Sequence, residues 1–454
     1  MIFKSISDMS CDFFQKCCKT HIYVSLLVSQ LSLFSGFTHA YSAILIPQLT
    51  DPSSSLQIHS SEASWIASFG TICRPVGAFF EGLIIEKYGR KRCIQISTAL
   101  HACSWIYLSF SCDILSIYFC RILTGLATGM EYSAGIYMIE VSPTSQRGTL
   151  LSLMAPITAT GTLITYILGY LLSWRLTSLI FGIYALLMLI LQLFIYDTPI
   201  WYTIKNQKHQ ALRSLLWLRG DNRSQVKNEL EDLEMKIQMH KDSQTKYLKR
   251  FTDRSVWKPF MILLIFSIFQ KSAGQDAIFA YAVNFFSLFR TNIQQNVLSI
   301  IFAIISLIGS MNIVLLVHKF NRTTILLYSG LGMSISLAIG AIFLEFNQTL
   351  ITVCCIFMYI YCCMSGMMSV PYMIIGESFP YHVRGVMGAA VSVFMFLPSF
   401  FNIKLFLTLT EILQPFGLLC YYSFFALCAA VFSKLFIVET RGKTLDEITE
   451  EYAN

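Results

Sequence analysis

Long apolar stretches alternate with short polar ones along almost the whole chain. Stretches near or above about 20 residues are long enough to cross the hydrocarbon core of a bilayer as helices. We expect twelve of them, at 22–48, 62–84, 93–111, 115–139, 149–173, 176–196, 258–287, 296–317, 324–345, 350–376, 386–411 and 416–437. Strands of a membrane barrel would instead alternate apolar and polar positions over about ten residues. The pattern therefore predicts an all-α membrane protein with twelve transmembrane helices.

One charged pattern occurs twice, each time where an apolar stretch ends. Residues Glu140 to Gly148 and Glu377 to Gly385 both read E-x-x-P-x-x-x-R-G, and the second copy begins 237 residues after the first. Two shorter patterns are echoed at similar spacing, namely Lys87–Arg90 by Lys319–Arg322 and Asp197-Thr198 by Glu439-Thr440. Secondary transporters are commonly built from repeated halves that hold the substrate between them near mid-membrane. The repeats predict two pseudo-symmetric six-helix halves, at 22–196 and 258–437.

The positive charges indicate how the chain is oriented in the membrane. Hydrophobic residues make up 55% of the chain and charged ones only 13%. With both termini in the cytosol, 27 of the 33 Lys and Arg residues fall in inner segments, as the positive-inside rule requires. We therefore expect a cytosolic N-terminus at 1–21, a cytosolic helical linker at 197–257 and a cytosolic tail at 438–454. The first 20 residues lack the features of a signal peptide, so we expect the first helix to be retained.

The remaining composition excludes several classes of function. The formal charge of +7 follows from membrane topology, so we expect no nucleic-acid partner. Most of the fourteen cysteines lie inside apolar stretches and pair with no histidine at a metal-binding spacing, so we expect no metal and no cofactor. No nucleophile–base constellation suggests an enzyme. We expect a multi-pass monomer surrounded by lipid, in the plasma membrane.

Motifs in several loops resemble one family of transporters. They lie in order at Gly82–Arg92, Arg121–Gly125, Asp197–Trp201, Gly376–Pro380 and Val438–Glu447. Together they resemble the sugar-porter branch of the major facilitator superfamily, and most of all the insect facilitated trehalose and glucose transporters. The resemblance spans nearly the whole chain, and it implies the major facilitator fold and a sugar as the substrate.

The resemblance also implies ion-pair networks on the inner face of each half. In the first half the residues are Glu86, Arg90, Arg121, Glu140 and Arg147, and in the second they are Arg322, Glu377, Arg384 and Glu439. Exposed ion pairs contribute only about 0–1 kcal/mol each, but several in a partly dehydrated seam could hold the outward-open state. Their breaking on the inward swing would keep the two states within a few kcal/mol. The alternative is that these residues only end helices and anchor the inner face.

The resemblance places the substrate mainly against the second half, beginning with helix 7. Gln270, Gly274 and Tyr281 match the family pattern there, whereas Lys271 and Asp276 stand where the family has neutral amides. A charge inside the membrane is costly unless it is paired or faces water, and so indicates function. Five residues correspond to about 140° around an ideal helix, so the two charges cannot share a face. Unwinding at Gly274 could nevertheless bring them together.

Other expected contact positions lie on helices 8, 10 and 11. They align with Ser306, Tyr372 and Phe396, and the two aromatic side chains could stack on a sugar or pack between helices. Because these side chains differ from those of the family, the sequence leaves the identity of the substrate more open than the mechanism.

Proton coupling in the family uses a carboxylate in helix 1, and Thr38 stands at that place. Since threonine does not titrate near neutral pH, we expect a facilitative uniporter that moves a hexose or trehalose by alternating access. Two alternatives remain open: a sugar sensor on a transporter scaffold, and a proton-coupled carrier of another polar solute. In the second case Asp276 or Glu131 would carry the proton.

Overall fold

The computed structural model describes residues 20–52, 54, 56–142, 147–219, 226–235, 254–379, 384–441, 443, 447–448 and 451–452. Every regular element within these ranges is a helix, and helices occupy all twelve predicted stretches. Eight helical runs in the described part are long and apolar enough to cross a membrane by length and composition alone. One of them, Ala390–Phe436, covers two of the predicted stretches.

The first half consists of six rods, several of them interrupted. They are α2 (Gln30–Thr50), α3 (Ser60–Ile72) with α4 (Arg74–Tyr88), α5 (Arg90–Ser109), α6 (Ile114–Gly129) with α7 (Tyr132–Val141), α8 (Arg147–Ser152) with α9 (Met154–Leu171), and α10 (Trp174–Leu193). The linker that follows contains α11 (Pro199–Ile204) and α12 (Lys208–Arg219). Residues 226–235 are also helical, and Val226 and Leu230 pack with Ala211 and Leu215 of α12.

The second half is more strongly interrupted than the first. Its elements are α14 (Arg254–Ser272), α15 (Gln275–Ala280), α16 (Ala282–Ser287), α17 (Gln295–Lys319), α18 (Arg322–Glu345), α19 (Thr349–Cys362), the π-helical turn Cys363–Met367, α20 (Val370–Glu377) and α21 (Arg384–Phe436). Two helices are joined within α21 across a kink at Gln414, whose φ is 55°. The second half therefore also supplies six rods within the described residues.

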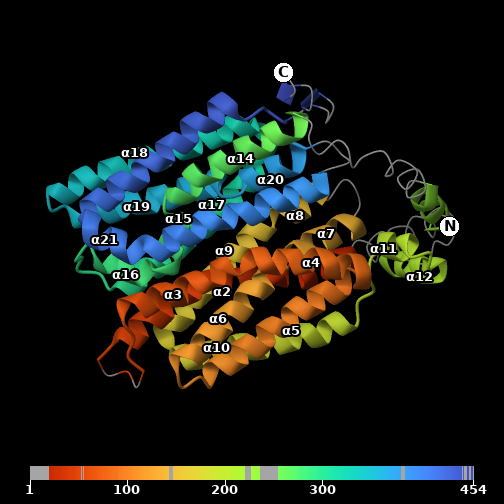
Figure 1. Cartoon of the computed structure of the whole chain (residues 1–454), viewed down its shortest axis with the longest axis horizontal. Helices are drawn as coiled ribbons and strands as arrows, with labels where there is room; N and C mark the ends of the chain where they lie inside the picture. Colours follow the sequence, from red (N-terminus) through yellow and green to blue (C-terminus); the bar gives the residue numbers. More distant parts are fainter. Residues whose placement is uncertain are drawn as a thin grey trace, which may run out of the picture.

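The two halves form bundles that lie side by side (Figure 1). Helices α11 and α12 lie beyond one end of the bundles, which we call the linker end (Figure 1). Between the halves, α2 contacts α15 and α16, α9 contacts α17, and α21 contacts α3 and α4. We call this interface the seam.

Glycines bring neighbouring helices of the first half into close contact. A methyl group on Gly36 of α2 would overlap the carbonyl oxygen of Thr158 on α9. A methyl group on Gly77 of α4 would likewise overlap the carbonyl oxygen of Leu126 on α6. Small residues allow this approach in membrane helices, where dispersion contacts drive packing. The positions of α2 and α4, which both face the seam, are thereby fixed within their half.

Candidate functional site

The seventh rod is broken at Gly274. Helix α14 ends at Ser272 and α15 begins at Gln275, and Gly274 between them has a φ of +92°. An added Cβ at Gly274 would overlap the ring of Tyr422, so both the backbone angle and the space favour glycine. The break is the local unwinding on which the sequence-based pairing of Lys271 with Asp276 depends.

Lys271 and Asp276 form an ion pair across this break. The Nζ of Lys271 lies 3.1 Å from Oδ2 of Asp276, and the side chains are only 3% and 7% exposed. The Oγ of Ser399 on α21 donates a second hydrogen bond to Asp276. Each charge is therefore compensated within the second half, as a buried charge in a membrane requires.

Neutral polar groups surround the same break. The amide nitrogen of Gln270 donates to the carbonyl oxygen of Met367 at 2.8 Å, whereas its amide oxygen is buried with no partner in the described part. Both amide atoms of Gln275 and the hydroxyl of Tyr281 are also buried and unpartnered there. Buried polar groups are costly unless they are hydrogen-bonded. These donors and acceptors are therefore suited to a ligand rich in hydroxyl groups.

The other expected substrate residues differ in their surroundings. Ser306 is buried but donates to the carbonyl of Ala303 in its own helix, so its hydroxyl is already used locally. Tyr372 is 40% exposed. The ring of Phe396 lies 5.5 Å from the guanidinium carbon of Arg74, across the seam. Phe396 therefore meets the first half across the seam.

A small cavity lies in the seam between the two halves. Its lining includes Thr38 and His39 of α2, Arg74 of α4, Arg121 of α6 and Asp276 of α15. The resemblance directed attention to the second half, so His39 and Arg74 were not among the expected substrate residues. The sequence does contain a signal for Arg74, because an arginine inside an apolar stretch by itself indicates a functional site.

Arg121 lies elsewhere than the resemblance implied. Its guanidinium donates to the carbonyl oxygens of Ile66 at 2.9 Å and Thr38 at 3.3 Å, and to Oγ of Ser42 at 2.9 Å. The expectation that it joins the inner-face network was therefore wrong. Arg121 lies in the part of α6 that is remote from the linker end, because the chain enters this rod at Ile114 from the opposite end.

Two residues of the expected inner-face network, Arg90 and Glu140, form an ion pair at the linker end. Nη2 of Arg90 lies 2.7 Å from Oε1 of Glu140, and the Thr198 hydroxyl donates to the same carboxylate. Asp197 accepts hydrogen bonds from the backbone N–H groups of Arg90 and Lys91, both at 3.2 Å. Asp197 thus caps the start of α5, and burial raises its pKa despite these hydrogen bonds.

The second half repeats this arrangement. Nη2 of Arg322 lies 3.6 Å from Oε1 of Glu377, and the Thr440 hydroxyl donates to Oε2 of the same carboxylate. Glu439 accepts from the backbone N–H groups of Arg322 at 2.9 Å and Thr323 at 3.0 Å. Burial acts to raise the pKa of Glu439, but these bonds and the Thr323 hydroxyl bring it below its ordinary value. The echo of Asp197-Thr198 by Glu439-Thr440 is therefore a repeat in three dimensions.

Both ion pairs lie within a half and not across the seam. Each joins two helices of its own bundle, so neither connects the two halves directly in this conformation. Glu86 is exposed and forms no ion pair with any described residue. The side chains of Arg147 and Arg384 lie outside the part that the structure describes.

Polar contacts across the seam occur away from the linker end. Nζ of Lys404 donates to Oγ of Ser64 at 2.7 Å and lies 3.6 Å from the centre of the Trp65 ring. The hydroxyl of Tyr166 donates to the carbonyl oxygen of Phe279 at 2.7 Å.

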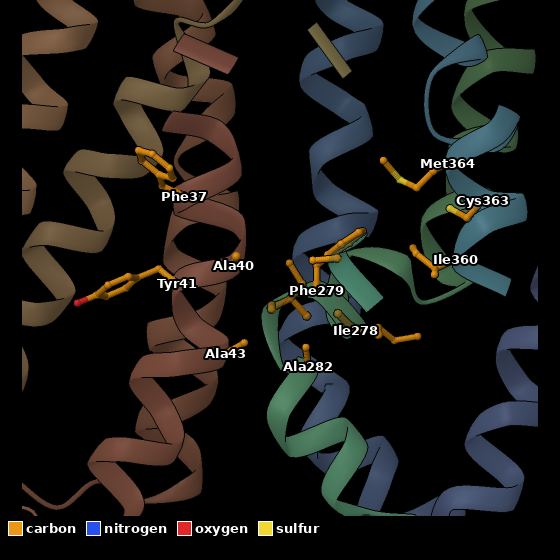
Figure 2. Close-up of a cluster of buried hydrophobic side chains, with 14 of the residues drawn as sticks. Phe37, Ala40, Tyr41, Ala43, Ile278, Phe279, Ala282, Ile360, Cys363 and Met364 are labelled. Carbon is orange, nitrogen blue, oxygen red and sulfur yellow. The ribbon is translucent and has the colours of Figure 1, made fainter. Parts of the chain in front are cut away.

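An apolar cluster supports the same interface. Figure 2 shows Ala40 and Ala43 of α2 pointing toward Phe279 and Ala282 of the broken seventh rod. Their small side chains allow α2 to approach α15 and α16 closely.

The model of the family described as Sugar (and other) transporter matches residues 24–452. The chain belongs to this family. It is therefore a multi-pass integral membrane protein of a transporter family rather than an enzyme.

Among the relatives, the Facilitated trehalose transporter Tret1-2 homolog of Drosophila sechellia is 27% identical over 442 residues, which cover 94% of this chain and 90% of that protein. The Facilitated trehalose transporter Tret1 of Drosophila grimshawi is 28% identical over 448 residues, or 94% of this chain. The chain spans about half of that relative's length, since the match covers 47% of it.

The fold is also that of solved major facilitator structures. An inward open conformation of the xylose transporter XylE from E. coli has a TM-score of 0.79 and 20% identity, covering 95% of this chain and 99% of that one. The proton:xylose symporter XylE bound to 6-bromo-6-deoxy-D-glucose has a TM-score of 0.78 and 19% identity, covering 96% and 99%. The expected major facilitator fold is confirmed.

Proposed function

We propose that this protein carries a hexose or trehalose across the plasma membrane by alternating access of its two halves. Relatives named facilitated trehalose transporters match 94% of the chain, which supports the choice of substrate. The observation that carries the proposal is the set of buried neutral groups at the Gly274 break. Gln270, Gln275 and Tyr281 offer unpartnered atoms that can exchange hydrogen bonds with sugar hydroxyls.

We further propose that transport is facilitative. Thr38 occupies the place where the family resemblance puts the proton-coupling carboxylate, and Arg121 beside it donates to carbonyl and hydroxyl oxygens rather than to a carboxylate. Asp276 is already held by Lys271 and Ser399. A uniporter needs no titrating group in its cycle, and this arrangement supplies none at position 38.

Proton coupling is the second candidate function, and one observation favours it. His39 and Asp276 line the same cavity, and histidine is the side chain that titrates nearest to neutral pH. In that case a proton would bind there as sugar binds.

In the proposed cycle, each half moves as a unit and the seam opens alternately at its two ends. The Arg90–Glu140 and Arg322–Glu377 pairs brace the linker end of each half, and contacts such as Lys404–Ser64 close the other end. The proposed topology places both termini and the linker in the cytosol, and the proposed working unit is a monomer.

Uptake into proteoliposomes containing the purified full chain tests both proposals. Labelled glucose or trehalose should equilibrate without exceeding the outside concentration, and a protonophore should leave the initial rate unchanged. Accumulation that collapses with the protonophore would replace uniport by proton coupling. Absence of uptake of either sugar would refute the proposed substrates.

A further inference from the structure

Arg74 is a buried cation that forms no ion pair with the residues that the structure describes. It is the first residue of α4, is 7% exposed and lines the seam cavity. Its Nε is buried and unpartnered, and its guanidinium forms no hydrogen bond or ion pair with the residues that the structure describes. An arginine inside a membrane protein is costly unless it is compensated, which marks this one as functional.

The charges around Arg74 do not neutralise it directly. Arg121 and His39 share the cavity, and Asp276, the carboxylate that lines it, is already paired with Lys271. Glu131 on the neighbouring rod interacts with Arg74 through space, but the two form no ion pair within 4.0 Å. The lining of the cavity therefore includes two arginines and one carboxylate, and that carboxylate is already paired with Lys271.

The geometry of Arg74 leaves its hydrogen-bonding groups available. Phe396 lies 5.5 Å from the guanidinium carbon, a distance typical of a cation–π contact, and such a contact uses the charge but not the N–H donors. A planar guanidinium presents paired N–H groups that match a carboxylate or a phosphate.

We propose that Arg74 binds the oxyanion of an acidic sugar, a carboxylate or a phosphate, while the neutral groups at the Gly274 break bind the sugar hydroxyls. This inference rests on the proposed sugar transport and narrows its substrate class. The two ends of the ligand would then contact different halves, so that binding itself would draw the halves together.

The test compares acidic and neutral sugars on the full chain. Glucuronate and glucose 6-phosphate are tested as competitors of labelled glucose uptake in proteoliposomes. The rise in melting temperature that each causes is also measured on the protein in detergent. At least one of the two should bind tenfold or more tightly than glucose. Arg74→Gln should reduce the ratio of acidic to neutral affinity at least tenfold, and Arg74→Lys should retain part of the preference. The preferred acid distinguishes a carboxylate from a phosphate.

Glu131→Gln is the control that tests whether Arg74 serves only as the electrostatic partner of Glu131. It should leave the acidic preference intact or strengthen it, because it removes a competing negative charge. Uptake of neutral sugars with no preference for the acidic sugars, in either the competition or the melting assay, would overturn the inference and leave the proposed function standing. An Arg74→Gln defect that Glu131→Gln restores would also overturn it, because Arg74 would then serve only to pair with Glu131. Absence of all uptake would refute the proposed function, while the melting shifts would still decide the role of Arg74.

Discussion

Neutralising either member of the Lys271–Asp276 pair should harm the protein more than neutralising both. The single changes Lys271→Gln and Asp276→Asn each leave one charge buried near mid-membrane. The double change leaves two neutral amides, as in the family pattern. Because the pair spans the Gly274 break, the same experiment also tests the unwound backbone.

The structure sets the expected size of the effect. Two unit charges at 3.1 Å attract by about 5 kcal/mol at an effective dielectric constant of about 20. Removing one partner of a buried pair typically costs about 3–5 kcal/mol, much of it from the charge left behind. Lys271→Gln would leave Asp276 with its hydrogen bond from Ser399, whereas Asp276→Asn would remove the one ion pair that Lys271 forms with the described residues. Asp276→Asn should therefore be the worse of the two.

The assay is a double-mutant cycle read by melting temperature in detergent and by initial rates of sugar uptake. We expect both single variants to melt below the parent and the double variant to recover most of the difference. Neutral-sugar uptake should recover in the double variant if the charges only replace an amide pair. It should be lost if the charges recognise the substrate.

Additive losses in the cycle would refute the reasoning, because coupled residues must deviate from additivity. The absence of any loss from either single change would refute it as well. A Gly274→Ala variant provides the matched backbone control. It should destabilise the break while leaving both charges in the chain.

The remaining predictions concern the two ends of the bundle and the energy source. Arg90→Ala should slow turnover more than it weakens sugar binding, and adding Glu140→Ala should cause little further loss; equal independent effects in uptake kinetics would contradict the bracing role. Lys404→Ala should make a cysteine introduced into the seam cavity by Ala67→Cys more reactive to reagents added at the end away from the linker, and unchanged labelling would exclude Lys404 as a closing contact. Glu439 has a lowered pKa, so its stabilisation is present above its unfolded pKa and is lost as pH falls through the folded value. Glu439→Gln should therefore lower the melting temperature at pH 7 and remove part of its fall at acid pH, and parallel melting curves would argue against this. Thr38→Asp should introduce a protonophore-sensitive component into uptake, and an unaltered profile would show that position 38 does not control coupling.

Much of the fold follows from local patterns in the sequence. Apolar length predicts helices because backbone groups in lipid must bond within their own segment. The repeated charged patterns predict two equivalent halves, and Asp197 and Glu439 do cap the starts of α5 and α18 in the same way. Gly274 is a further local signal, since a glycine between two charges allows the chain to turn where a helix would separate them.

The candidate site was less accessible to sequence reasoning because it is assembled across the seam. Ser64 and Lys404 are 340 residues apart and meet through the packing of two bundles, which no local pattern records. Arg121 shows a related limit, because a motif gives the residue's position along a helix but not the groups that its side chain reaches. Arg74 was visible as a charge in an apolar stretch, but only the packed helices show that its guanidinium forms no hydrogen bond or ion pair with the described residues.

The glycine contacts in the first half have a mechanical consequence. Where Gly77 meets α6 and Gly36 meets α9, backbone lies against backbone with no flexible side chain between them to absorb strain. A displacement of one helix is then transmitted almost fully to the next, because close-packed backbone deforms little. A ligand that displaces α4 on binding would therefore move the neighbouring helices together with α4. The deformation would then occur mainly in the seam.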